Sequence, residues 1–214
     1  MTDKKTGSAR LLPIAANASL IALELVGAAV GFASGGVPKF KYYTILSNVF
    51  ALVSSIAFLV SYLKRGGKFK HIAGLMRYFA SCCLAVTFLT VVFVLVPMAV
   101  PHGTAAEVLY KGPQLYHHIL CPILACLSFI FIEQGIVPDK RLAALACAPT
   151  LLYAVVFIIL NLLRVTRGPY PFLHVYEQPW FLSVIWFILI GGVAIGSSLL
   201  IGKLKKLFAK PALP

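Results

Sequence analysis

The stretch that decides the fold is WFLSVIWFILIGGVAIGSSLLIG, residues 180–202, which has no charged residue over 23 positions. An α-helix of this length, rising 1.5 Å per residue, is about 34 Å long, enough to cross a hydrocarbon core about 30 Å thick. Strands that cross membranes are only about ten residues long and alternate apolar and polar faces. The segment is therefore predicted to be a transmembrane helix.

Apolar blocks of this kind recur along the chain, which has the composition of an integral membrane protein. Of its 214 residues, 60% are hydrophobic and 12% are charged, whereas soluble domains are about 45–50% apolar and about a quarter charged. The apolar content excludes a disordered chain, and the cysteine usage excludes a secreted disulfide scaffold. The predicted fold class is all-α, a single-domain bundle (residues 1–214) of six transmembrane helices. The helices are expected at residues 11–33, 42–63, 75–99, 115–135, 142–164 and 180–202.

The distribution of basic residues predicts the orientation of the bundle. The N-terminal tail, the second and fourth connections and the C-terminal tail hold 14 of the 19 Lys and Arg, with Arg77 counted in the second connection. Because basic residues are retained on the cytoplasmic side, both termini are expected in the cytoplasm. The formal net charge of +13 is assigned to topology and to anionic headgroups, and no nucleic-acid motif is visible. No nucleic-acid partner is predicted.

With this orientation, polar residues gather at the outer end of the bundle. Thr44 lies in the first turn of the second helix, and His117 and His118 lie in the first turns of the fourth. Glu24 is about nine residues, roughly 13 Å, below the outer end of the first helix. Asn48 is one turn below Thr44 on the same helix face. The same end also holds Asn161, Tyr170 and His174.

These residue types suit the hydrolysis of a lipid ester. A threonine hydroxyl beside an imidazole is a nucleophile with its general base. The first turn of a helix adds unpaired N–H groups and the positive end of the helix dipole, which can stabilise an oxyanion, while Glu24 or Asn48 could orient the imidazole. The residues also allow other readings, in which Thr44 is a helix cap, the histidines meet headgroups and Glu24 is a structural hydrogen-bond partner.

No metal and no other cofactor is predicted. The histidines lack the paired spacing of a zinc hydrolase. The cysteines include no C-x-x-C pair and are interpreted as packing residues. They are Cys82, Cys83, Cys121, Cys126 and Cys147.

Three short motifs in chain order resemble those of the androgen-induced and androgen-dependent membrane proteins. Lys41-Tyr42-Tyr43-Thr44-Ile45-Leu46-Ser47-Asn48 resembles the K-x-x-T entry to a helix in that family. His117-His118-Ile119-Leu120-Cys121-Pro122 resembles the H-x(3,4)-P segment, and Gly168-Pro169-Tyr170-Pro171-Phe172-Leu173 is similar to the G-x-x-Y-P-F-L turn. The loops look prokaryotic, so the resemblance is to a bacterial branch of the family.

This resemblance implies a membrane-embedded threonine hydrolase that cleaves fatty-acid esters of hydroxy fatty acids or similar lipids. Thr44 matches the nucleophile. The base is His118 by a spacing of four residues to the proline, or His117 by a spacing of five, and His118 is preferred. Residues expected to bind or orient the substrate are Asn48, Ser47, Glu24, Asn161, Tyr170 and His174. Lys39, Lys41 or Arg167 could hold a fatty-acid carboxylate.

The expected partners are the bilayer and a lipid or fatty-acyl ester substrate, in a bacterial plasma membrane. The alternative prediction is a non-catalytic lipid-binding protein or a small-molecule transporter. In that case Glu24, Asn48 and Asn161 would line a binding or permeation path.

Overall fold

The computed structural model describes residues 2–34, 40–64 and 68–208, and every regular element in these ranges is helical. Six helices are long and apolar enough to cross a membrane, which confirms the predicted all-α architecture with six spans. The spans are Leu11–Ala33, Tyr43–Leu63, Phe69–His102, Leu115–Ile132, Lys140–Leu162 and Trp180–Phe208.

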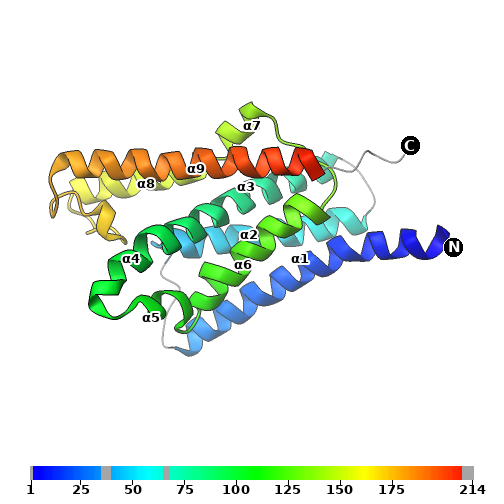
Figure 1. Cartoon of the computed structure of the whole chain (residues 1–214), viewed down its shortest axis with the longest axis horizontal. Coiled ribbons are helices and arrows are strands. Elements are labelled where there is room, and N and C mark those ends of the chain that lie inside the picture. The colour runs from blue at the N-terminus through cyan, green and yellow to red at the C-terminus, as the bar shows by residue number, and fades with distance from the viewer. Residues whose placement is uncertain (1, 35–39, 65–67, 209–214) are drawn as a thin grey trace.

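The helices run back and forth along one bundle (Figure 1). Helix α1 begins and α9 ends at one end, while α4, α5 and the connection before α9 lie at the other, here called the α5 end. The α-helices are α1 (Thr2–Ala33), α2 (Tyr43–Leu63), α3 (Lys68–Thr90), α4 (Val96–Ala99), α5 (Ala105–Tyr110), α6 (Cys121–Leu127), α7 (Lys140–Leu145), α8 (Ala148–Leu162) and α9 (Trp180–Phe208). The short turns between them are η1 (Val91–Leu95), η2 (Val100–His102), η3 (Leu115–Leu120), η4 (Ser128–Ile132) and η5 (Pro171–Leu173).

Helix α3 is the centre of the bundle and packs against α2, α6 and α9. Small side chains contribute to this packing, since Ala80 of α3 lies in one buried cluster with Ala51 of α2 and Ala125 of α6. Lipid tails are as apolar as the side chains, so transmembrane helices associate through close packing rather than through the hydrophobic effect. Small residues favour this association because they let the helix backbones approach closely. Large apolar side chains such as Phe93 and Ile188 are instead exposed. The lipid-facing surface is therefore apolar, as a membrane-spanning bundle requires.

A proline determines the geometry of the segment that carries the two histidines. Pro122 has no N–H, so it cannot donate to the carbonyl of His118 four residues earlier. The preceding turn, η3, is π-helical, and the N–H of Cys121 donates to the carbonyl of Tyr116 five residues back. Such π turns are rare and frequently lie at functional sites.

The placing of Arg77 in a connection is wrong, and one predicted span contains a break. The third span begins at Phe69 rather than at residue 75, and Arg77 is fully buried within it. Counting Arg77 among the connection residues was therefore incorrect. The fifth block is two helices, α7 and α8, because Pro149 at the start of α8 cannot donate to Leu145 and its ring crowds that carbonyl.

Candidate functional site

A cavity of about 660 Å³ at the α5 end brings together residues that are far apart in the chain. Thr44 from α2, His117 and His118 from η3 and Tyr170 from the last connection all line it. Much of the remaining wall is apolar, with Leu95 and Met98 among its residues, and His102, Thr104 and Gln114 add further polar groups. Mostly apolar cavities of a few hundred Å³ with a few convergent polar groups are typical of small-molecule sites.

Thr44 is buried in the first turn of α2 and is not a helix cap. The N-cap residue is Tyr42, which makes no side-chain cap, and Thr44 lies two residues inside. The Oη of Tyr170 lies 3.3 Å from both the backbone N and the Oγ1 of Thr44. Because the Thr44 N–H donates to Tyr170 Oη, the tyrosine O–H remains free to donate in turn.

The expected free N–H groups at the start of α2 are in fact paired. The Thr44 N–H donates to Tyr170, and the Tyr43 N–H donates to Tyr153 Oη at 3.1 Å. The hydroxyl of Tyr153 itself donates to the Lys41 carbonyl at 2.6 Å. An oxyanion at this helix end would therefore meet the Tyr170 hydroxyl rather than bare backbone groups.

A backbone contact gives the neutral His118 ring the tautomer that a general base needs. Its Nδ1 lies 2.7 Å from the carbonyl oxygen of Val108. A carbonyl can only accept, so Nδ1 carries the hydrogen, and the neutral ring then has its lone pair on Nε2. That Nε2 has no hydrogen-bond partner among the described residues. Helix α5, which carries Val108, thus orients the imidazole at the cavity wall.

His117 lies against α1 instead. Its Nε2 is 3.8 Å from Glu24 Oε2, and a Cβ added at Gly27 would lie only 2.7 Å from the same nitrogen. The two adjacent imidazoles therefore have different partners, as helical geometry requires. His117 approaches a buried carboxyl group, whereas His118 is anchored to a backbone carbonyl.

The predicted direct contact between Thr44 and an imidazole is absent. Within the described ranges, Thr44 Oγ1 forms no hydrogen bond with His117 or His118, and its side-chain partner is Tyr170. The groups line one cavity without touching. Catalytic hydrogen bonds are often long without substrate and tighten when it binds.

Asn48 and Ser47 join the start of α2 to neighbouring elements, and neither lines the 660 Å³ cavity. Asn48 Nδ2 donates to the carbonyl of Thr44 at 2.7 Å and to that of His117 at 3.2 Å, which joins α2 to η3. Ser47 Oγ donates to the Thr44 carbonyl at 3.0 Å and lies 2.9 Å from Thr87 Oγ1 of α3. Both are positioning residues for the start of α2.

Asn161 and His174 lie in a separate cluster and do not reach Thr44. Asn161 holds the last connection, because its Nδ2 donates to the carbonyl of Thr166 at 3.1 Å and its Oδ1 accepts from the N–H of Val175 at 3.2 Å. His174 Nδ1 is 3.3 Å from Glu177 Oε2. These residues line a different pocket of about 240 Å³.

The two described cations that were expected to hold a carboxylate, Arg167 and Lys41, do not line the 660 Å³ cavity. Arg167 forms two hydrogen bonds to Glu177, at 2.5 and 2.6 Å, and the guanidinium lowers the pKa of that carboxyl group. Lys41 lies over the ring of Tyr42, with Nζ 5.5 Å from its centroid. Lys39 lies outside the described residues.

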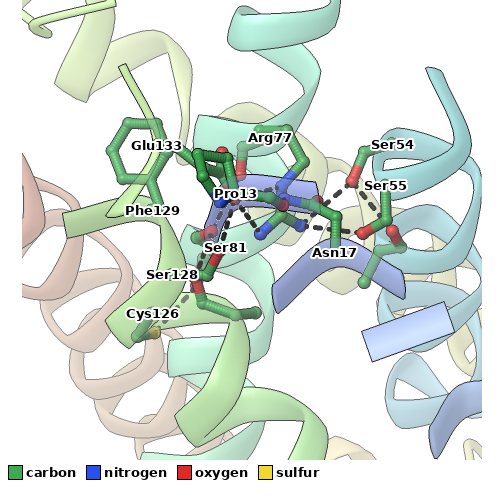
Figure 2. Close-up of polar contacts among 12 residues, drawn as sticks. Pro13, Asn17, Ser54, Ser55, Arg77, Ser81, Cys126, Ser128, Phe129 and Glu133 are labelled. Atoms are coloured by element: carbon green, nitrogen blue, oxygen red, sulfur yellow. Dashed lines mark hydrogen bonds and ion pairs between the residues drawn. The ribbon is translucent and has the colours of Figure 1, made fainter. Parts of the chain in front are cut away.

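A buried ionic network was missed by the sequence interpretation (Figure 2). Arg77 Nε and Nη2 donate to Glu133 Oε1 at 3.0 and 2.8 Å. The same oxygen accepts from Asn17 Nδ2 at 3.1 Å and from Ser128 Oγ at 2.8 Å. One carboxylate oxygen therefore joins α1, α3 and the end of η4.

Further polar groups complete this network. Arg77 Nη1 donates to Ser55 Oγ of α2 at 3.2 Å, and Lys205 Nζ of α9 donates to the carbonyls of Phe129 and Glu133. The one sequence signal was a charged residue, Arg77, within a long apolar run, since such residues usually pair inside the bundle. The network lies away from the α5 end. It links the helices and does not line the 660 Å³ cavity.

The described residues contain no group of three His, Cys, Asp or Glu side chains that could hold a metal ion. Comparisons with protein-family models, with curated proteins and with solved structures gave no match to this chain.

Proposed function

We propose that the protein is a membrane-embedded ester hydrolase with Thr44 as nucleophile and His118 as general base. The observation that carries this proposal is the arrangement around one cavity. Thr44 Oγ1 and an imidazole whose Nε2 is unpartnered among the described residues line the same 660 Å³ space. The substrate class is that of the resemblance, fatty-acid esters of hydroxy fatty acids or similar lipids.

The proposed reaction has two halves. Thr44 Oγ attacks the ester carbonyl carbon as its proton passes to His118 Nε2. The tetrahedral intermediate collapses, the bond to the alcohol oxygen breaks, and the alcohol leaves with the proton from His118. Water then attacks the acyl-threonine and gives its proton to His118, which returns it to Thr44 as the carboxylic acid departs.

The Tyr170 hydroxyl is suited to stabilise the oxyanion of both halves. Burial raises the pKa of Tyr170 above its usual value, so the phenol stays protonated and can donate. Its Oη is already 3.3 Å from Thr44 Oγ1, next to the carbon that Thr44 would attack. In known enzymes, removing one hydrogen-bond donor to the oxyanion lowers kcat by about 10²–10³-fold.

The variant Tyr170→Phe is therefore expected to lower kcat by about 10²-fold with little change in KM. The matched control is Tyr153→Phe, which removes the hydroxyl that accepts from Tyr43 on the same helix turn but does not contact Thr44. Its kcat should stay close to wild type. Equal losses in the two variants would show that the Tyr170 hydroxyl acts only by supporting α2.

A second pair of variants distinguishes which of the two histidines is the general base. His118→Ala is expected to lower kcat for a long-chain lipid ester by roughly 10³-fold, as loss of a general base does. His117→Ala should lower it far less, because its Nε2 lies near Glu24 of α1. Release of fatty acid by the purified protein in nanodiscs measures both. The reverse order would make His117 the base, and turnover by both variants at the wild-type rate would exclude this chemistry.

We also propose membership of the androgen-induced and androgen-dependent family, and a location in a bacterial plasma membrane with both termini in the cytoplasm. The excess of Lys and Arg in the connections opposite the α5 end supports this orientation. A single cysteine placed at Lys111, near α5, should then react with an impermeant maleimide added to whole cells, and one at Lys140 should not. The opposite pattern would reverse the topology.

The second candidate is a non-catalytic lipid-binding protein. It is favoured by an apolar pocket between α1 and α2, with Glu24 and Asn48 among its lining residues, that Thr44 does not line. Catalysis remains the preferred proposal because the second candidate gives no role to the orientation of His118 beside Thr44.

A further inference from the structure

A second large cavity, of about 830 Å³, lies where α2 ends, α3 begins and the chain enters α7, and is here called the α7 cavity. Two exposed basic residues line it. Lys70 is the second residue of the third span, and Arg141 is the second residue of the fifth. The ends of spans are where long basic side chains meet lipid headgroups. The α7 cavity therefore gathers cations from two spans at such an end.

The charge on the wall of the α7 cavity is mainly positive. Within the described residues, neither Lys70 nor Arg141 forms an ion pair. One described lining residue is acidic, Asp139, and its Oδ1 accepts from the N–H of Leu142 at 2.8 Å, which caps α7. His71 also lines the cavity and can donate a hydrogen bond. The wall thus presents two cations and one carboxylate that already has a backbone partner.

The remaining acidic residues of the chain leave these two cations available. The chain has six Asp and Glu residues in all. Three form ion pairs with other cations: Glu107, Glu133 and Glu177. Glu24 is buried near His117. The segments that the structure does not describe, 35–39, 65–67 and 209–214, hold three basic residues and no acidic one.

Much of the α7 cavity is also apolar. Val137 and Leu145 line it and are 45% and 59% exposed, so the cavity is open beside them. Leu145 lies four residues after Arg141 on α7, and residues at this spacing share a helix face. An alkyl chain can therefore lie over Leu145 while a headgroup meets Arg141. The volume of the cavity is within the range of small-molecule sites, about 300–1,000 Å³.

These features select a phosphate group that is attached to alkyl chains. The guanidinium fork of arginine matches the oxygens of a phosphate, and lysine binds phosphate as a point charge. Basic pockets between transmembrane helices bind anionic headgroups in known proteins. A soluble phosphate would use the cations and leave the apolar wall without a contact. An anionic phospholipid uses both.

We propose that the α7 cavity binds an anionic phospholipid. Lys70 and Arg141 contact its phosphate group, and its acyl chains lie over Val137 and Leu145. Thr44 does not line the α7 cavity, so this binding does not depend on the proposed hydrolysis.

The test measures lipid binding to the purified full-length protein in detergent by native mass spectrometry. The protein is titrated with phosphatidylglycerol or with phosphatidylcholine that has the same acyl chains. The wild type is expected to bind phosphatidylglycerol about tenfold more tightly or better, because the choline of the other lipid neutralises its phosphate. Thermal unfolding tests the soluble source of the same group. Inorganic phosphate should not stabilise the protein, whereas short-chain phosphatidylglycerol should.

Two double variants separate a site from general attraction between a basic protein and an anionic lipid. Lys70→Gln with Arg141→Gln should remove the preference for phosphatidylglycerol. Both residues are exposed, so the fold should persist. The control, Lys203→Gln with Lys206→Gln, removes the same charge from exposed positions of α9 that do not line the α7 cavity. It should keep the wild-type preference.

Three outcomes overturn the proposal. Equal losses in the two double variants would show that only the net charge attracts the lipid. Equal affinity of the wild type for phosphatidylglycerol and phosphatidylcholine would show that the cations select no headgroup. Stabilisation by inorganic phosphate as large as that by short-chain phosphatidylglycerol would assign the α7 cavity to a soluble anion. The last two are read on the wild-type protein, so they decide the matter even if a variant fails to fold.

Discussion

Replacing Thr44 by valine is expected to lower kcat/KM for a long-chain lipid ester by at least about 10⁴-fold, the scale on which loss of a nucleophile acts in hydrolases of this type. Valine keeps the shape of threonine, and its backbone N–H can still donate to Tyr170 Oη as in the wild type. The protein should therefore remain folded while losing the attacking oxygen. Fatty-acid release in nanodiscs measures the rate, and thermal unfolding reports the fold.

The control for this substitution is Thr87→Val. Thr87 is also buried, on α3, where its hydroxyl contacts Ser47 at 2.9 Å, but it does not line the 660 Å³ cavity. Its turnover should stay within a few-fold of wild type. Thr44→Ser, which keeps a hydroxyl, should retain more activity than Thr44→Val. If Thr44→Val and Thr87→Val turn over at the same rate, Thr44 is a structural residue.

The second large effect concerns stability. Glu133→Leu is expected to destabilise the folded protein by about 3–5 kcal/mol, because it leaves the buried charge of Arg77 without its carboxylate. The same substitution also leaves Asn17 Nδ2 and Ser128 Oγ without the oxygen to which they donate. A denaturant or thermal unfolding curve of the detergent-solubilised protein measures the loss.

A double variant and a surface control complete this test. Replacing both charges, in Arg77→Met with Glu133→Leu, should recover much of the stability, since well-packed apolar residues often replace a buried ion pair at little cost. Glu107→Ala removes an exposed ion pair with Lys111 and should leave stability unchanged, as surface pairs contribute little. A loss in Glu133→Leu no larger than that in Glu107→Ala would mean that the network does not hold the bundle.

The six spans were predictable because a helix that crosses a lipid bilayer must have a certain length and an apolar composition. Both can be recognised in a short stretch of sequence. The burial of Arg77 was not predictable in this way. The number of basic residues near a span end does not show whether their side chains face water or form ion pairs inside the bundle. Arg77 is satisfied by Glu133, 56 residues later, and by Ser55 of α2, and neither contact can be read from the local sequence. The break before α8 could have been read from Pro149.

At the site, the predicted topology indicated which residues could meet, and the structure brings Thr44, His117, His118 and Tyr170 to one cavity. Local sequence could not give the direction of each imidazole, because that depends on the π turn before Pro122 and on the carbonyl of Val108. Asn161 was grouped with Thr44 because both were expected at the same end of the bundle. Sharing an end does not mean sharing a cavity.

The most direct test of the account is the site of covalent attachment of a long-chain alkyl fluorophosphonate. Nucleophilic attack expels fluoride and leaves the phosphonate on the attacking oxygen. We expect the wild-type protein in nanodiscs to be labelled at Thr44, as mapped by peptide mass spectrometry, and the His118→Ala variant to be labelled much more slowly. Attachment at any other residue, or labelling that persists unchanged in Thr44→Val, would contradict it.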